Sequence, residues 1–190
     1  MSMIFKRKIM GQNLQKFIIK SFWVLVAIFI IRCLISKPTS PYDCFGFAGE
    51  AISVTMIIMG IYERWLWQFN PLERTPNIKG KYSGSIEYNY NGNSDKKETT
   101  ILIKQTLFST NVRITTNEIT SSTIISNIIL ENNEYVLYYT YITNPKNKYS
   151  RENPVQYGTS RVIIKNKTEL EGIYWTTRQT IGDIYLKRIL

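Results

Sequence analysis

The stretch that decides the fold is FWVLVAIFII, from Phe22 to Ile31, ten consecutive apolar residues without a charge. Extended to 17–35, the run has about nineteen residues, roughly the length that crosses a 30 Å hydrocarbon core. Lys20 and Arg32 fall near its ends, where long basic side chains can reach the lipid headgroups. The sequence therefore predicts a transmembrane helix at 17–35.

A second apolar run follows, FGFAGEAISVTMIIMGIY, and predicts a second transmembrane helix at 45–62. Trp65 and Trp67 after it are typical of the aromatic belt at a membrane interface. A signal peptide would also place basic residues before an apolar run, but no small-residue cleavage pattern follows Ile31. Because only a short loop separates the two runs, we expect an antiparallel hairpin whose two ends lie on one side.

Basic residues are distributed unevenly around this hairpin. The loop has Lys37 opposite Asp43, whereas five basic residues lie before or within the start of the first span. These five are Lys6, Arg7, Lys8, Lys16 and Lys20. The positive-inside rule therefore predicts that both termini, and the C-terminal domain, are cytoplasmic.

Glu50 is the unusual residue of the second span, because an acidic side chain inside a membrane helix is unfavourable. Gly46, Glu50 and Ser53 share a helical face with Gly49 beside them, and small residues let membrane helices approach closely. One interpretation is a helix–helix or pore-lining contact, which makes Gly46, Gly49, Glu50 and Ser53 candidates for oligomerisation in the membrane. The other is that Glu50 lies near the headgroups and stays hydrated.

The cysteine and histidine content restricts the chemistry. The chain has Cys33, Cys44 and no histidine, so Ser-His-Asp, Cys-His and histidine–metal sites all lack a principal member. A reducing compartment is the simpler interpretation of two thiols, and a Cys33–Cys44 bridge across the loop is the alternative. With no catalytic motif visible, we predict no enzymatic activity, no cofactor and no metal site.

The pattern changes beyond a linker at 70–77. From 78 to 90 apolar and polar residues alternate, which predicts a strand, and Asn91-Gly92-Asn93 is a hairpin turn signal. Further strands are predicted at 97–106, 109–116, 120–130, 134–144, 158–165, 168–177 and 182–189, with Asn132-Asn133 as one turn point. The chain thus divides into a transmembrane helical hairpin at 1–69, the linker and an all-β domain at 78–190. Eight short strands favour an antiparallel, lipocalin-like barrel, with a sandwich as the alternative.

Aromatic and basic residues are interspersed along this β-rich domain, and the chain's net charge of +10 suits a phosphate-bearing ligand or a membrane surface. Aromatic faces stack on nucleobases and arginine binds phosphate, although the same aromatics can simply fill a barrel. Trp175 and Arg178 share a site only if the strand bends or ends between them. The predicted ligand-binding residues are Arg178, Trp175, Tyr82, Arg113, Tyr139, Arg161 and Thr180.

The order of several motifs resembles a known family. They are the membrane hairpin, Trp65-Leu66-Trp67, Asn70-Pro71-Leu72, Thr75-Pro76-Asn77, Gly80-Lys81-Tyr82-Ser83-Gly84, and Gly172-Ile173-Tyr174-Trp175-Thr176-Thr177-Arg178 with Thr180 and Gly182. Together they resemble the Cap15-type effectors of bacterial cyclic-oligonucleotide antiphage signalling (CBASS), which have two transmembrane helices and a β-barrel.

The resemblance implies a barrel on the cytoplasmic side of the bacterial inner membrane. It implies binding of a cyclic dinucleotide made by a cGAS-like nucleotidyltransferase, followed by homo-oligomerisation, membrane disruption and death of the infected cell. We expect no DNA or RNA partner.

Three other functions fit the same composition. A membrane-tethered lipid or fatty-acid carrier would have an apolar cavity without convergent arginines. An enzyme acting at the membrane would need a nucleophile–base pair, and an inert anchoring or immunity protein would have a completely filled barrel.

Overall fold

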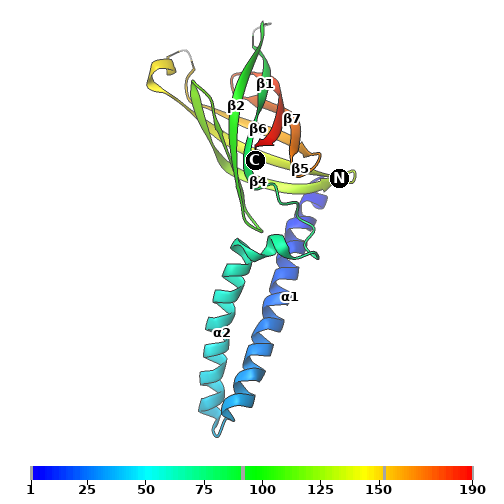
Figure 1. Ribbon diagram of the computed structural model, residues 1–190, viewed down its shortest axis with the longest axis vertical. Coiled ribbons are helices and arrows are strands. Elements are labelled where there is room, and N and C mark those ends of the chain that lie inside the picture. Colours follow the sequence, from blue (N-terminus) through cyan, green and yellow to red (C-terminus); the bar gives the residue numbers. More distant parts are fainter. Residues whose placement is uncertain (1, 91–92, 152, 190) are drawn as a thin grey trace. The chain divides into compact units, whose positions relative to one another are not determined.

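The computed structural model of the chain describes residues 2–90, 93–151 and 153–189, without the side chains of 2–13, 90 and 93. It divides into two compact units, Met1–Glu73 and Arg74–Leu190. The first unit is helical and the second is a β-barrel (Figure 1). This arrangement confirms the predicted fold class of an apolar helical hairpin followed by an all-β domain.

The helical unit has two long helices that run antiparallel, α1 (Ser2–Ser36) and α2 (Pro41–Arg64), followed by the short 3₁₀ helix η1 (Leu66–Phe69) (Figure 1). The segments Leu14–Ser36 and Pro41–Arg64 are long and apolar enough to cross a membrane. Ala51, Thr55 and Met59 are the buried residues of α2. Their spacing of four residues defines the face of α2 that packs inside the hairpin.

The tight loop between the helices is set by local hydrogen bonds. Ser40 caps the N-terminus of α2 by accepting a bond from the Asp43 backbone N at 3.3 Å, and the Asp43 carboxylate accepts one from the Ser40 backbone N at 2.9 Å. Pro41, which lacks an N–H group, begins the helix where such a group would have no partner. This reciprocal capping box fixes the point at which the chain reverses.

The second unit is a closed antiparallel barrel of eight strands, each paired with its neighbours in the sequence. The strands are β1 (Gly80–Tyr90), β2 (Asn93–Gln105), β3 (Thr110–Thr115), β4 (Ile119–Glu131), β5 (Glu134–Pro145), β6 (Gln156–Ile164), β7 (Glu169–Thr176) and β8 (Ile181–Ile189), and a 3₁₀ helix η2 (Asn147–Tyr149) follows β5. Pairing of β1 with β8 closes the barrel, from Lys81↔Ile189 to Asn89↔Ile181. Closure excludes the sandwich and leaves no open sheet edge.

The turns and strand ends depend on local residue chemistry, and here the observed boundaries can be compared with the predicted ones. Asn132 and Asn133 both have positive φ angles, 47° and 66°, as a two-residue hairpin turn requires. The predicted turn at Asn91-Gly92 lies outside the described residues. β2 begins four residues earlier than the predicted 97, because cross-strand pairs such as Lys96–Glu87 at 2.7 Å extend its hairpin with β1.

The seam between β3 and β4 differs from the other seven. Its backbone register has one pair, Thr115↔Thr120. The Thr123 hydroxyl accepts from the Val112 backbone N at 2.9 Å and donates to the Val112 carbonyl at 2.8 Å, while Ser121 accepts from the Ile114 backbone N at 3.3 Å. Side-chain hydroxyls therefore satisfy backbone groups of β3 that a regular ladder would pair.

The core fills one half of the barrel. Tyr82, Ile101 and Leu137 are almost completely buried there, and β3 alternates between buried and exposed side chains as a strand with one face inside must. Close strand contacts are made possible by glycine: a Cβ at Gly172 would lie 2.1 Å from the Arg161 carbonyl oxygen. This filled half includes the start of β1 and the end of β2.

Candidate functional site

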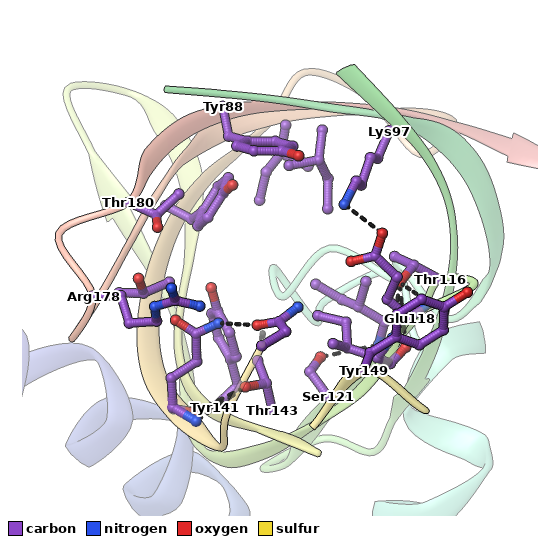
Figure 2. A pocket seen from close by; sticks show the side chains of 18 residues that line it. Tyr88, Lys97, Thr116, Glu118, Ser121, Tyr141, Thr143, Tyr149, Arg178 and Thr180 are labelled. Atoms are coloured by element: carbon purple, nitrogen blue, oxygen red, sulfur yellow. Dashed lines mark hydrogen bonds and ion pairs between the residues drawn. The ribbon is translucent and has the colours of Figure 1, made fainter. Parts of the chain in front are cut away.

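A cavity of about 390 Å³ occupies the other half of the barrel, where β1, β3, β5 and β7 end. Figure 2 shows the side chains that line it. They are Ile86, Tyr88, Lys97, Ile114, Thr116, Glu118, Ile119, Ser121, Tyr141, Thr143, Tyr149, Asn153, Gln156, Tyr174, Thr176, Arg178, Thr180 and Ile184. We refer to this cavity as the pocket.

The pocket exists because small polar residues occupy inward positions where the filled half has large apolar ones. Thr116, Ser121 and Thr143 line the pocket. In the filled half, inward positions are taken by residues such as Leu137 and Ile101. Since branched apolar side chains fill the interior of an eight-stranded barrel, replacing them with serine and threonine leaves an opening for a ligand.

Lys97 and Glu118 form an ion pair at one side of the pocket, with Nζ and Oε1 2.7 Å apart (Figure 2). The Lys97 ammonium also lies 5.5 Å from the centre of the Tyr88 ring. Burial acts to lower the pKa of Lys97, but its contacts with Glu118 and Tyr88 outweigh burial and raise it. Lys97 therefore carries a positive charge at neutral pH.

The turn between β3 and β4 fixes Glu118. The Thr116 hydroxyl accepts hydrogen bonds from the backbone N of Glu118 at 3.2 Å and of Ile119 at 3.1 Å. The Glu118 carbonyl in turn accepts from the Lys146 backbone N at 2.9 Å. Because its backbone N–H and its carbonyl are both hydrogen-bonded, Glu118 presents its carboxylate from a defined position.

The β7–β8 turn supplies Arg178 and Thr180. The Thr176 backbone N donates to the Thr180 carbonyl and the Gln179 backbone N to the Thr176 carbonyl, both at 3.0 Å. Gln179 takes a positive φ of 61°, which reverses the chain within the turn. Both Arg178 and Thr180 line the pocket, and Figure 2 shows Arg178 across it from Lys97 and Glu118. Two cationic groups therefore face the pocket from different sides.

Tyrosines form much of the pocket wall. Tyr88, Tyr141 and Tyr174 come from strands, and Tyr149 comes from η2. Burial raises the pKa of Tyr141 and Tyr174 far above the usual value, so both rings stay neutral. Aromatic walls with cations on two sides can stack flat groups and bind anionic ones.

Two buried polar atoms of the pocket have no hydrogen-bond partner among the described residues. They are the Gln156 side-chain oxygen and the Thr176 hydroxyl. The Gln156 amide is oriented by its other end, because its nitrogen donates to the Asn153 side-chain oxygen at 3.1 Å. Buried polar groups are nearly always hydrogen-bonded, so these two atoms mark positions where a ligand or water would bind.

The structure separates the predicted ligand-binding residues. Arg178 and Thr180 line the pocket. Tyr139 is buried directly beside Tyr141, with ring centres 5.6 Å apart. Tyr82 lies in the filled half, completely buried, and its hydroxyl donates to the Ile78 carbonyl at 2.9 Å. Neither of these two tyrosines lines the pocket, so their contact with a ligand stays a prediction.

The remaining three predicted residues point away from the pocket. Trp175 is 42% exposed, because it follows the inward-facing Tyr174 on β7 and successive strand residues point to opposite faces. Arg113 is exposed on the outer face of β3. Arg161 donates to the Glu131 carboxylate at 3.1 Å and the Tyr138 hydroxyl at 3.0 Å outside the barrel. Their predicted role gains no support from the pocket.

Sequence reasoning missed Lys97, Glu118 and Gln156. A signal existed for Lys97, which lies an even number of residues before the buried Ile101 and therefore shares its inward face. Glu118 lies in a turn, where periodicity gives no direction, and Gln156 lies two residues before the predicted strand at 158–165. Their position depends on how the turn and the strand end are held.

The candidate membrane residues are all exposed on α2: Gly46, Gly49 and Ser53 lie away from the buried face of the hairpin, and Glu50 lies at its edge, where it contacts α1. Apart from its chain neighbours and the backbone of its own helix, a Cβ at Gly46 or Gly49 would have no atom of the described residues within 4 Å. Ser53 donates to the Gly49 carbonyl at 2.9 Å, and Glu50 pairs with Arg32 of α1 at 2.5 Å. The ion pair shows how the acidic and basic side chains of the spans compensate each other; the predicted oligomer contact stays a prediction.

The pocket also argues against two of the other functions considered, the lipid carrier and the inert protein with a filled barrel. Its two basic side chains and one acidic one differ from the apolar, arginine-free cavity expected of a lipid carrier, and a filled barrel is excluded. Within the described residues, no group of three or more cysteine, aspartate or glutamate side chains could hold a metal ion.

Comparison with known proteins places these features in context. Residues 73–188 match the family described as Cap15, cyclic dinucleotide receptor domain. The chain is 34% identical over 170 residues to CD-NTase-associated protein 15 of Staphylococcus schleiferi. That alignment covers 88% of this chain and 92% of the relative, so it extends over both the helical unit and the barrel.

Proposed function

This chain belongs to the Cap15 family of cyclic dinucleotide receptors, and on that premise we propose that it is a membrane-anchored effector of CBASS antiphage signalling. Its ligand binds in the pocket of the barrel. The observation that carries this proposal is the pocket itself. It has tyrosine walls, two cations on different sides and two buried polar atoms that lack a hydrogen-bond partner among the described residues.

The two charged phosphates of a cyclic dinucleotide match the two cations. Arg178 offers a planar fork of N–H donors, the geometry that favours phosphate, and Lys97 offers a point charge. Such charge-assisted bonds are roughly twice as strong as neutral ones. We therefore assign phosphate contacts to Arg178 and Lys97.

The bases occupy the aromatic and polar remainder of the pocket. Tyr88, Tyr141 and Tyr149 supply ring faces, and base–aromatic stacking contributes about 1–3 kcal/mol per base. The Gln156 oxygen can accept a hydrogen bond from a base amino group, and the Thr176 hydroxyl can donate or accept one. Thr180 adds a third polar contact at the rim of the pocket.

Calorimetry on the full-length protein in detergent tests the ligand class. We expect micromolar or tighter binding of at least one cyclic dinucleotide, with one ligand per barrel, and no binding of palmitate. Linear dinucleotides of the same bases serve as controls. Saturable palmitate binding without cyclic dinucleotide binding would favour a fatty-acid carrier and remove the receptor proposal.

We place the protein in the bacterial inner membrane with both termini and the barrel in the cytoplasm, where a cGAS-like nucleotidyltransferase would make the ligand. The basic residues before α1 support this orientation, as does the CD-NTase association in the relative's name. A Pro38→Cys variant, with Cys33 and Cys44 replaced by serine, tests it in intact spheroplasts. An impermeant maleimide should label position 38 and leave a cysteine after Leu190 unlabelled; the reverse pattern would contradict the orientation.

Ligand binding is coupled to the membrane by assembly. A ligand shifts an equilibrium only through differential affinity for its two states, and about 5.5 kcal/mol would turn 1:99 into 99:1. We propose that ligand-bound chains associate through the α2 face of Gly46, Gly49, Glu50 and Ser53, and that this homo-oligomer disrupts the membrane and kills the infected cell. The uncovered glycines support this, since small residues allow close helix approach.

Dye release from liposomes tests the coupling. Ligand should raise both the crosslinked oligomer and the leakage, and Gly49→Leu should suppress both while leaving ligand affinity unchanged. Ile58→Leu, at an exposed α2 position that is neither three nor four residues from any of the four residues of that face, is the control and should leak normally. A protein that binds its nucleotide without any change in assembly or leakage would be a passive sensor instead.

A further inference from the structure

Glu118 is the one acidic side chain among the described residues that line the pocket. A carboxylate is a poor neighbour for a ligand with two negative phosphates, because like charges at close range repel in a partly desolvated site. The presence of the Glu118 carboxylate in the pocket is therefore best explained by a specific contact with another part of the ligand.

The position of this carboxylate is fixed by the fold. The Thr116 hydroxyl, bonded to the Glu118 backbone N at 3.2 Å, and the Lys146 backbone N, bonded to the Glu118 carbonyl at 2.9 Å, hold the turn. The side chain is 30% exposed and directed at Lys97 (Figure 2). A ligand that enters the pocket must meet this acceptor.

We infer that Glu118 reads the Watson–Crick edge of a guanine base, so that the pocket selects a guanine-containing cyclic dinucleotide. This inference rests on the proposed function. An ionised carboxylate is an acceptor with two oxygens, and guanine presents two adjacent donors, its N1–H and its 2-amino group. Adenine, cytosine and uracil each place acceptor atoms beside a donor on that edge, so one carboxylate oxygen would face a lone pair.

Ligand binding would replace the Lys97–Glu118 ion pair by two contacts with the ligand, and neither charged group would be left without a partner. Without ligand, the Lys97 ammonium lies 2.7 Å from the Glu118 carboxylate. When guanine binds the carboxylate, the ammonium becomes available to a ligand phosphate. Both charged groups then keep a charge-assisted hydrogen bond. A ligand that supplies phosphate without guanine would instead leave Glu118 without donors after drawing Lys97 away.

A thermodynamic cycle between protein and ligand isolates the contact. Affinities of full-length wild type and Glu118→Gln, in detergent, are measured for cyclic di-GMP, cyclic di-IMP, cyclic di-AMP and cyclic GMP–AMP, each in 3′,3′ and 2′,3′ linkage. Hypoxanthine of the IMP ligand lacks only the 2-amino group of guanine. We expect wild type to bind the best guanine ligand about tenfold tighter than its hypoxanthine or adenine counterpart, as one charged hydrogen bond would give. In Glu118→Gln this preference should fall below threefold, while adenine ligands bind as before or tighter.

Glu171→Gln is the matched control, since Glu171 pairs with Lys165 at 2.9 Å outside the barrel. It removes the same charge and should keep the guanine preference. If Glu118→Gln weakened the affinity for every ligand equally, the role of Glu118 would be to hold Lys97. If wild type preferred adenine ligands, another base would contact Glu118. Either result overturns the inference and leaves the receptor function standing. If no cyclic dinucleotide binds wild type, the proposed function fails and the inference fails with it.

Discussion

The two halves of the barrel are built from the same eight paired strands but differ in the side chains that face the interior. We call the half that contains the pocket the hollow half. In the filled half, Ile101 and Leu137 occupy the interior and leave at most 1% of their surface exposed. In the hollow half, Thr143 and Ser121 occupy equivalent inward positions and leave a cavity of about 390 Å³. The same backbone architecture therefore provides a stabilising core at one end and a ligand pocket at the other, and side-chain size decides which.

The largest effect on stability is expected in the filled half. Leu137→Ala should lower the free energy of unfolding by about 3 kcal/mol, since it removes buried methyl groups and leaves a cavity. Urea unfolding of the full-length protein in detergent measures the change. Ile125→Ala, at a position 67% exposed, should cost under about 0.5 kcal/mol. Similar losses for both variants would show that the filled half is not the main source of stability.

Alkaline pH should weaken the fold through buried tyrosines. Burial raises the pKa of Tyr139 to about 12, whereas an exposed tyrosine titrates near 10. Because the folded state holds its proton more tightly, the Tyr139 contribution is complete below pH 10 and is lost as the pH rises towards 12.

The variant Tyr139→Phe isolates that contribution. Between pH 9 and 12 it should lose about 2–3 kcal/mol less stability than wild type, since a shift of two units corresponds to about that free energy. Chemical unfolding across the pH range measures it. Parallel pH profiles for the two proteins would mean that Tyr139 does not titrate differently in the folded state.

In the hollow half the effect should fall on binding. Arg178→Ala should weaken cyclic dinucleotide binding tenfold or more, about 1.4 kcal/mol, and leave the unfolding free energy within about 0.5 kcal/mol of wild type. Arg113→Ala, which removes an arginine from the outer face of β3, is the control and should bind normally. Calorimetry that finds the opposite ranking would move the site outside the barrel.

The seam between β3 and β4 should show the smallest change. Thr123→Val keeps the side-chain shape but removes a hydroxyl that makes two hydrogen bonds to Val112. We expect a loss of about 1 kcal/mol and faster hydrogen exchange at Val112 in particular. Thr120→Val at the one regular pair of this seam is the comparison; equal exchange at Val112 in both variants would contradict a special role for Thr123.

Much of the architecture was predictable because it depends on periodicity. Continuous apolar runs gave the two helices, and alternation gave the eight strands, since a strand with one face inside repeats every two residues. The Asn132-Asn133 turn was predictable because asparagine tolerates positive φ. These signals are local, because each lies within one continuous segment of the sequence.

The site was less predictable because its residues meet through the turns. Trp175 was a reasonable candidate from its neighbours, but it alternates with Tyr174 on β7, and since Tyr174 points inward Trp175 points outward. Glu118 enters the pocket only because Thr116 and Lys146 hold its turn. Likewise, Arg32 and Glu50 are 18 residues apart in sequence, and their pairing depends on the register of two helices. Such contacts cannot be read from spacing alone.

Hydrogen exchange with and without a bound cyclic dinucleotide tests most directly whether the hollow half is the receptor site. The full-length protein in detergent is compared at saturating ligand, and exchange is followed by mass spectrometry. We predict slower exchange at 114–121 and 174–181, the segments that carry Glu118 and Arg178, with little change at 134–138 in the filled half. Bound ligand that slows exchange only at 158–165, around Arg161 on the outer face, or that leaves both pocket segments unchanged, would contradict the account.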